Sequence, residues 1–335
     1  PPFGMWFALF ALSIPMIGAV NLVRDDGALK SAALLGWVTG AGWFVYSLSW
    51  ISNALITSGG AHMLLIPFSL LGLPLFLGLF WVAAFMATHR IVLWCKLNSS
   101  QHVMLLIIMI SIVEYVRGFI LTGFPWNAPG LVLASNDIGL STASVIGYWG
   151  AGLLALLFAA LPVMAITAGR VGLVLCSAVI LVFIGLGQMP TKPYPNNATD
   201  MTVRVIQPNI AQSDKWDFEK RRMHLSAIVA ASRGDDGPVP ALVVWPETAF
   251  AGIYERERGV ASAFVQAATQ GSAHVITGIL SAKEDPFQLF NAVMIFGPDG
   301  QMHGQVNKRH LVPFGEFAPL RSIIPFVDII AGPVD

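Results

Sequence analysis

Long apolar stretches dominate the first 190 residues of the chain. A helix needs about 20 apolar residues to cross the hydrocarbon core of a membrane, and six stretches reach that length. The predicted spans are residues 5–23, 31–51, 63–87, 103–122, 142–167 and 171–189. Within the fourth span, Glu114 and Arg117 are spaced i, i+3, which predicts an ion pair on one helix face near the outer end of the span.

The pattern changes after residue 190, where short apolar runs alternate with charged segments. The predicted elements are strands at 202–207, 241–245 and 274–280, helices at 214–233 (with Ser213 or Asp214 as N-cap) and 257–270, and a hairpin at 291–306 around the turn 297–300. Strands that alternate with helices and then pair with one another indicate an α/β domain with a mixed sheet. We therefore predict two domains: a transmembrane domain of about six helices over residues 1–190, and an α/β domain over residues 191–335.

Composition supports this division. The chain is 55% hydrophobic and only 11% charged, whereas a soluble protein has roughly 25% charged residues. The first 190 residues hold six of the 19 Lys and Arg residues, so the charge is concentrated in the second domain. The formal net charge is zero, which gives no indication of a nucleic-acid partner.

The charges between the predicted spans indicate an orientation. Lys and Arg occur only in alternate connections, at Arg24, Lys30, Arg90, Lys96 and Arg170. The connections at 52–62 and 123–141 contain no Lys or Arg. The positive-inside rule places the first set in the cytoplasm. The α/β domain is therefore expected outside, which is the periplasmic side of the inner membrane in a Gram-negative cell.

Two residues of the α/β domain are candidates for acid–base and electrostatic chemistry. Glu247, in Trp245-Pro246-Glu247-Thr248, directly follows a buried strand, where open α/β sheets build their sites and where partial desolvation suits a general base. Its alternative role is a loop glutamate that caps the next segment. Lys308, in Asn307-Lys308-Arg309-His310, could stabilise an oxyanion, and its alternative is a basic surface turn. Glu316 follows eight residues later and could orient or neutralise this lysine.

Two tryptophans are candidates for substrate contact. Trp216 is either an exposed aromatic that faces substrate or an anchor of the core. Trp126 lies in the apolar loop Gly123-Phe124-Pro125-Trp126, which suits the headgroup layer of a membrane, and structural anchoring is its alternative. Cys95 and Cys176 lie in or beside the apolar half and suggest neither a disulfide framework nor a metal cluster.

Together these motifs resemble the apolipoprotein N-acyltransferase family of the nitrilase superfamily. The similar stretches are Glu114-Tyr115-Val116-Arg117-Gly118, Thr122-Gly123-Phe124-Pro125-Trp126, Trp245-Pro246-Glu247, Thr277-Gly278, Asn291 and the long block from Asn307 to Pro319. The resemblance implies an αββα sandwich for the second domain, incomplete in this sequence. It assigns Glu247 as general base, Lys308 as the oxyanion-stabilising lysine and Glu316 as a supporting glutamate, and it implies substrate contacts for Trp216, Trp126 and Asn291.

The resemblance also implies a reaction. A cysteine thiolate takes a fatty acyl group from a membrane phospholipid, and the thioester then acylates the N-terminal amine of a diacylated apolipoprotein, with no metal or organic cofactor. The implied protein is a monomer in the bacterial inner membrane. The family's nucleophilic cysteine belongs to a later Cys-Tyr-Glu-type segment, and the family has spans before Pro1 and after the catalytic domain. We therefore expect a sequence truncated at both ends, and a fragment inactive without that cysteine.

Two other functions remain open at this point. A membrane-tethered nitrilase-type amidohydrolase would use the same residues with water as acceptor. A non-catalytic polytopic membrane protein, such as a transporter or scaffold, would need neither Glu247 nor Lys308. Carriers usually have polar residues at the bilayer midplane, whereas Glu114 and Arg117 lie toward the outer end of their predicted span, which counts against transport.

Overall fold

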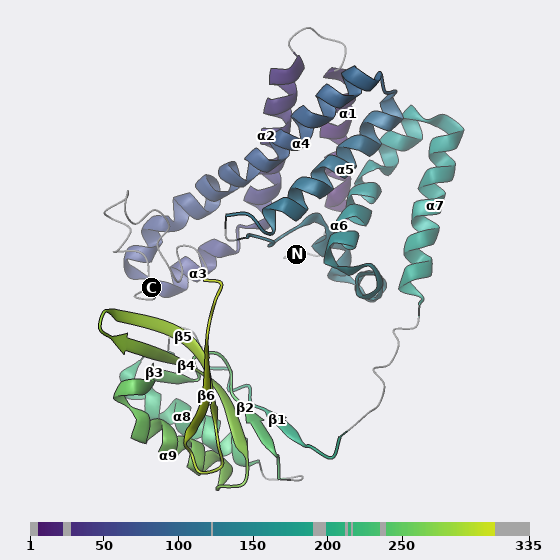
Figure 1. Cartoon of the computed structure of the whole chain (residues 1–335). Helices are drawn as coiled ribbons and strands as arrows, with labels where there is room; N and C mark the ends of the chain where they lie inside the picture. Colours follow the sequence, from purple (N-terminus) through teal and green to yellow (C-terminus); the bar gives the residue numbers. More distant parts are fainter. Residues whose placement is uncertain are drawn as a thin grey trace. The chain divides into compact units, whose positions relative to one another are not determined.

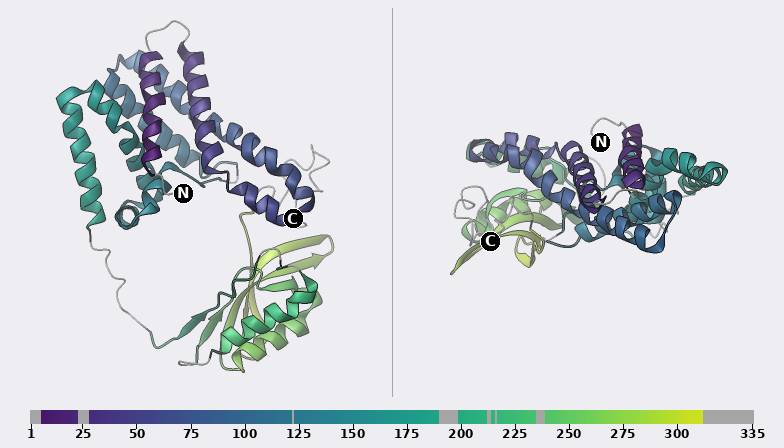
Figure 2. Two further views of the ribbon diagram at one scale, coloured as in Figure 1. Left: turned by 180° about the vertical axis from the view of Figure 1, so that it is seen from behind. Right: turned by 90° about the horizontal axis from the view of Figure 1, so that it is seen from above.

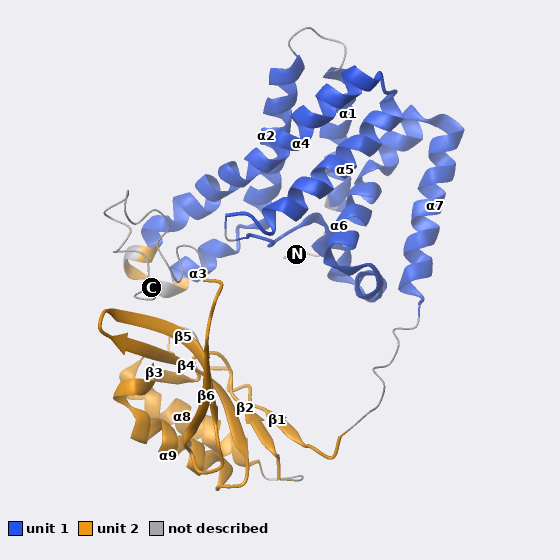
Figure 3. Cartoon of the chain, viewed as in Figure 1, with its two compact units in different colours: residues 1–56, 63–193 blue, residues 57–62, 194–335 orange. Residues whose placement is uncertain are grey.

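The computed structural model describes residues 6–22, 28–121, 123–189, 199–211, 214–215, 217–234 and 239–311. The chain forms two compact units (Figure 3). The first comprises Pro1–Ile56 and Met63–Pro193, and the second comprises Thr57–His62 and Tyr194–Asp335. The first is helical, and the second contains a sheet with two helices (Figure 1).

Helices cover all six stretches predicted as spans. The elements are η1 (Trp6–Leu12), α1 (Ser13–Leu22), α2 (Ala28–Ser47), α3 (Ile51–Ser58), η2 (Gly60–Leu65), η3 (Phe68–Gly72), α4 (Leu73–Cys95), α5 (Ser99–Arg117), η4 (Pro129–Ser135), α6 (Asp137–Thr167) and α7 (Gly169–Gly187). Among the described residues, four helices are long and apolar enough to cross a membrane: His62–Cys95, Ser99–Arg117, Asp137–Thr167 and Gly169–Gly187. The apolar helix Leu9–Leu22 is shorter, and α2 is not among the four, so the count of six spans stays a prediction.

Two helix ends differ from the prediction, and one short helix was missed. α4 continues to Cys95, through much of the predicted connection 88–102. α5 starts at an Asn98 capping box and stops at Arg117, before the predicted end at residue 122. The chain turns back there, because Gly123 has a φ of +82° and the Phe124 amide donates to the Arg117 carbonyl. Helix α3 was not predicted, because its eight residues are too few to cross a membrane and lie mostly in the predicted connection 52–62.

The predicted ion pair between Glu114 and Arg117 is confirmed. Arg117 Nη2 lies 2.6 Å from Glu114 Oε2, and both side chains are buried. The Trp81 indole donates to Glu114 Oε1 at 2.9 Å, and Arg117 also donates to the Phe124 carbonyl. Removing one partner of such a buried pair typically costs about 3–5 kcal/mol, because the other charge is left uncompensated. The pair therefore ties the loop after α5 to the helical core.

The second unit contains a six-stranded mixed sheet, which confirms the predicted α/β class. Its elements are β1 (Val203–Val205), α8 (Phe218–Arg233), β2 (Leu242–Val244), β3 (Phe250–Ile253), η5 (Tyr254–Arg256), α9 (Arg258–Thr269), β4 (His274–Glu284), β5 (Phe287–Phe296) and β6 (Met302–Asn307). The strand order is β1-β2-β4-β5-β6, and β3 also pairs with β4. The first four strands run parallel, and β5 and β6 are antiparallel to their neighbours.

Some details of the second unit were predicted wrongly. α8 begins at Phe218 and is capped by Asp217, whose side chain accepts from the Glu219 amide, so neither Ser213 nor Asp214 is the N-cap. β3 was missed, as was the hairpin between β4 and β5. The first hairpin strand was expected from residue 291 but begins at Phe287, because the chain turns at Asp285-Pro286 rather than in a Gly-rich segment.

One face of the sheet carries the core of this unit. Val243, Val275 and Met294 are fully buried against α8 and α9, which lie together on that face (Figure 1). The alternate residues of β5 point to the opposite face, where Val293 and Ile295 are 49% and 40% exposed. The sheet therefore has a packed face and a more exposed face, and the position of each functional side chain follows from the face to which it belongs.

Candidate active site

Glu247 lies in the segment that joins the strands β2 and β3. Both strands pair with β4 in the same direction, and residues 245–249 join them. The Trp245 amide donates to the Ile276 carbonyl at 2.8 Å, and the Ala249 amide donates to the Gly278 carbonyl at 3.0 Å. Between these two hydrogen bonds the backbone bulges, with Thr248 at a φ of +53°. The bulge directs the Glu247 side chain out of the strand at this point.

Gly278 makes the bulge possible, because the backbone of residues 247–248 lies directly against it. A Cβ atom at position 278 would lie 2.5 Å from the Thr248 amide nitrogen and 2.6 Å from the Glu247 Cα. Real Cβ atoms do not approach backbone atoms so closely, so a side chain here would displace the segment that carries Glu247. The close approach of this backbone explains why a glycine occupies position 278 in the Thr277-Gly278 pair.

Gly278→Ala is expected to lower thermal stability by about 1–3 kcal/mol, the range typical of overpacking, and to impair any activity that depends on Glu247. Gly304→Ala is a matched control in the same sheet, since the nearest atom to its added Cβ is Ile295 Cδ1 at 3.9 Å. Thermal denaturation of the two variants measures the difference. Equal melting temperatures would show that the bulge accommodates a methyl group.

Two of the predicted residues, Asn291 and Lys308, contact the carboxylate of a third, Glu247. The Asn291 amide donates to Glu247 Oε1, and Lys308 Nζ lies 3.7 Å from the same oxygen. The Lys308 backbone amide donates to the Asn291 carbonyl at 2.8 Å. β4 pairs with β5 so that Leu280 lies opposite Asn291, and β6 ends one residue before Lys308. The sheet therefore brings together side chains that are 44 and 61 residues from Glu247 in the sequence.

The carboxylate is more exposed than the sequence suggested. The Glu247 side chain is 64% exposed and that of Lys308 is 34% exposed. The reason is the face of the sheet: Asn291 alternates with the buried Ala292, so the site lies on the face opposite α8 and α9. The sequence predicted a Glu247 carboxylate partly removed from solvent, and in the described part of the chain it is exposed.

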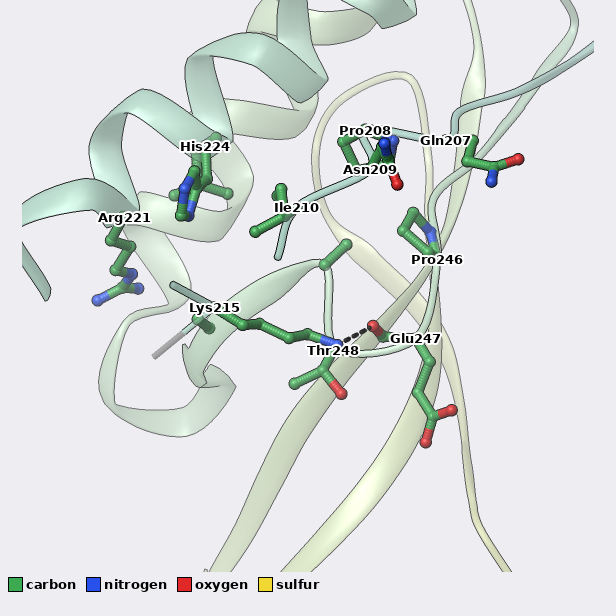
Figure 4. Close-up of a pocket in the computed structure, with 13 residues that line it drawn as sticks. Gln207, Pro208, Asn209, Ile210, Lys215, Arg221, His224, Pro246, Glu247 and Thr248 are labelled. Atoms are coloured by element: carbon green, nitrogen blue, oxygen red, sulfur yellow. Dashed lines mark hydrogen bonds between the residues drawn. The ribbon is translucent and has the colours of Figure 1, made fainter. Parts of the chain in front are cut away.

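A second polar feature adjoins the backbone of this segment. A cavity of about 190 Å³ lies between α8 and the bulge, and its lining includes Asn209, Lys215, Arg221, His224 and Pro246. Lys215 Nζ donates to the Glu247 carbonyl at 3.0 Å. Figure 4 shows Lys215 reaching that carbonyl, whereas the Glu247 carboxylate points away from the other labelled residues. Lys215 therefore contacts the backbone carbonyl of Glu247 and not its carboxylate.

A hydrogen-bond network near Lys308 was not predicted. Ser281 Oγ donates to Glu255 Oε1 at 2.6 Å and accepts from Gln305 Nε2 at 2.9 Å, and the same nitrogen donates to Asn307 Oδ1 at 2.8 Å. Glu255 also accepts from the Ala282 amide. The network fixes Asn307, the neighbour of Lys308. No sequence signal could have revealed it, because its members are spread over two strands, β4 and β6, and η5.

The other predicted residues fall into two groups. Glu316 and Trp216 lie outside the described residues. Trp126 belongs to the helical unit, is 53% exposed and makes an edge contact with Trp50 at 6.5 Å between ring centroids. Cys95 and Cys176 also belong to that unit and are unpaired. No group of His, Cys, Asp or Glu residues that could hold a metal occurs in the part of the chain that the structure describes.

Two family models match the chain, one in each unit. The family model "Apolipoprotein N-acyltransferase N-terminal domain" matches residues 1–161, and the model "Carbon-nitrogen hydrolase" matches residues 202–325. Proteins named apolipoprotein N-acyltransferase from Sinorhizobium medicae (strain WSM419) and Rhizobium meliloti (strain 1021) are each 32% identical over 342 residues, covering 97% of this chain. The protein of that name from Brucella suis biovar 1 is 30% identical over 343 residues. The chain spans 63% of the length of these relatives.

Proposed function

The chain belongs to the apolipoprotein N-acyltransferase family of the nitrilase superfamily, and on this premise we propose that it is part of an enzyme that N-acylates lipoproteins. The acyl donor is a membrane phospholipid, and the acceptor is the N-terminal amine of a diacylglyceryl-cysteine. The observation that carries the proposal is the convergence of Asn291 and Lys308 on the Glu247 carboxylate. A base and a cation held together in this way suit acyl transfer to and from a nucleophile.

In the first half-reaction, Glu247 takes the proton from a cysteine thiol of the full-length protein, and the thiolate attacks the ester carbonyl of the phospholipid. The Lys308 ammonium stabilises the negative charge on the tetrahedral oxygen. The intermediate then collapses, the bond from carbon to the glycerol oxygen breaks, and Glu247 returns the proton to the departing lysophospholipid. The enzyme is left as an acyl thioester.

In the second half-reaction, the lipoprotein amine attacks the thioester. Glu247 accepts the amine proton, the carbon–sulfur bond breaks, and Glu247 returns that proton to the departing thiolate. Asn291 orients the base by donating to Glu247 Oε1, and Lys215 fixes the backbone of the bulge. Glu316 and Trp216 retain the supporting and substrate-contacting roles that the resemblance implies.

The experiment that tests this function uses the full-length protein, labelled phospholipid and a synthetic diacylated lipopeptide. Triacylated lipopeptide and lysophospholipid should form in equal amounts. Formation of free fatty acid without acylated peptide would instead indicate a hydrolase that uses water. Absence of both products from a well-folded protein would contradict the proposal.

The apolar helices and the family together indicate a multi-pass membrane protein. We further propose that it lies in the inner membrane with the second unit in the periplasm, since Lys and Arg occur in alternate connections. A reporter that is active only in the periplasm should be active when fused after Gly300 and inactive when fused after Ser99. The reverse result would mean that the orientation is wrong.

A further inference from the structure

The polar cavity beside the bulge is a second place in this unit where a ligand could bind. It lies between α8 and the segment that joins β2 to β3. The left view of Figure 2 shows α8 in front of the strands. The cavity has a volume of about 190 Å³, whereas one water needs roughly 10–15 Å³ and a whole ligand roughly 300–1,000 Å³. Its size therefore suits one small group of a larger ligand.

Lys215 gives this cavity a positive charge that no carboxylate balances. Its ammonium donates to the Glu247 carbonyl at 3.0 Å, and no described Asp or Glu residue forms an ion pair with it. An ammonium has three N–H groups, so two remain for a ligand. The side chain is half-buried, and a partly desolvated charge without a counter-ion is unfavourable. Lys215 therefore favours an anion in the cavity.

The other charges at the cavity are either balanced or directed away from it. Arg221 lines the cavity, but two of its nitrogens donate to the Glu257 carboxylate, at 3.1 and 2.5 Å. The Glu247 carboxylate points away from the cavity (Figure 4). The charge that faces the cavity among the described residues is therefore net positive and comes from Lys215.

His224 adds a second hydrogen-bonding group. This residue of α8 is half-buried and lines the cavity, and no described residue forms a hydrogen bond with its ring. Figure 4 shows the Lys215 side chain running below His224 in that view. A neutral imidazole has one N–H donor and a protonated one has two. A lysine and a histidine around one small space suit the several acceptor oxygens of a phosphate group.

The cavity and the acyl-transfer site lie on either side of one residue. Lys215 contacts the Glu247 carbonyl, and Lys308 Nζ lies 3.7 Å from Glu247 Oε1, so the two ammonium groups contact opposite ends of one glutamate. In a glycerophospholipid, only the glycerol carbons and their oxygens separate the phosphate from the ester carbonyls. A phospholipid whose ester carbonyl lies at Lys308 can therefore extend its phosphate past the bulge to Lys215.

We propose that the cavity binds the phosphodiester group of the phospholipid acyl donor through Lys215 and His224. The identity of this lipid rests on the proposed function. The acceptor also carries glycerol esters but has no phosphate, and its N-terminal amine is largely cationic near neutral pH, so Lys215 repels it. The cavity therefore selects the donor for the first half-reaction, which contacts with the ester groups alone cannot do.

Lys215→Met and His224→Leu remove the two phosphate ligands separately. Lys215 also supports the bulge through the Glu247 carbonyl, whereas the His224 variant leaves that hydrogen bond in place. Lys220→Met is the matched control, because Lys220 lies on the same helix as His224, does not line the cavity and pairs with Asp214 at 2.9 Å. Melting temperatures show whether each variant retains its fold.

The test measures binding to the full-length protein in detergent micelles, so it does not depend on acyl transfer. Two lipids with the same ether-linked chains, a dialkylglycerophosphomethanol and the dialkylglycerol without phosphate, compete with a fluorescent phospholipid. The wild type should prefer the phosphate-bearing lipid by about ten- to a hundredfold, the range for hydrogen bonds to a charged group. Lys215→Met should lower this preference about tenfold and His224→Leu about fivefold, and Lys220→Met should leave it unchanged.

Equal affinities of the wild type for the two lipids would overturn the proposal. So would losses of affinity in Lys215→Met and His224→Leu that are the same for both lipids, because the two residues would then act only through the fold. Inorganic phosphate distinguishes the source of the anion and should displace the fluorescent lipid only at far higher concentration. Displacement as effective as that by the phosphate-bearing lipid would assign the cavity to a free anion and overturn the lipid assignment.

Acyl transfer from an ester-linked phospholipid, measured on the same preparations, separates this proposal from the proposed function. A phosphate preference that depends on Lys215 and His224, in a protein that transfers no acyl group, would contradict the function and leave the phosphate site in place. Acyl transfer by a protein without that preference would contradict the phosphate site alone.

Discussion

Lys308→Ala is expected to slow formation of the acyl-enzyme by a factor of about 10²–10³, the loss seen when one oxyanion-stabilising donor is removed from studied hydrolases. The backbone of Lys308 is fixed because its amide donates to the Asn291 carbonyl. The Lys308 ammonium lies 3.7 Å from Glu247 Oε1. Its charge acts on the transition state, where the negative charge develops, more than on the bound substrate. The expected change is therefore in the chemical step and not in substrate affinity.

The measurement is thioester formation from a fluorescent phospholipid by the full-length protein. Lys283→Ala is a suitable control, because this lysine is exposed at the far end of β4. Melting temperatures must accompany the rates, since Lys308 also forms an ion pair with a carboxylate. Unchanged thioester formation in Lys308→Ala would remove this residue from the mechanism, and a large loss of stability would assign it a structural role.

The hydrophobic pattern predicted most of the helices and the class of the second unit. Runs of about 20 apolar residues leave few alternatives to a helix, and the alternation of strands and helices after residue 200 predicted a mixed sheet. Helix ends were harder to predict. α5 ends at Arg117 because its guanidinium and carbonyl bind the returning loop at Phe124, which is a tertiary interaction that the periodicity of the sequence does not contain.

The candidate site was predicted as a set of residues but not as a geometry. The motifs predicted roles for Glu247 and Lys308, and the structure brings the two side chains together. Neither motif shows that β2 and β3 share one edge of β4 with a bulge between them. The substrate contact predicted for Asn291 stays a prediction, and the hydrogen bond that its amide donates to Glu247 was not predicted. The Glu247 carboxylate is exposed because α8 and α9 pack on the opposite face of the sheet, which the sequence does not specify.

Glu247→Gln is expected to lower the rate of acyl transfer by about 10²–10⁴, the usual contribution of a positioned general base. Glutamine has nearly the same shape, and its amide oxygen can still accept from Asn291, so the bulge and the fold should be retained. What is lost is the ability to take a proton, together with the negative charge beside Lys308. Both half-reactions need this proton transfer, so thioester formation and aminolysis should slow together.

Two further variants separate the loss of the base from the loss of a charge. Glu284→Gln removes an exposed carboxylate that pairs with Arg256 at 3.2 Å, and such surface pairs contribute about 0–1 kcal/mol, so its rate should match the wild type. Glu247→Asp keeps a base on a shorter side chain and should recover part of the rate that glutamine loses. If Glu247→Gln formed thioester within threefold of the wild type, the carboxylate would serve only to position Asn291 and Lys308, and the proton acceptor would have to be another group.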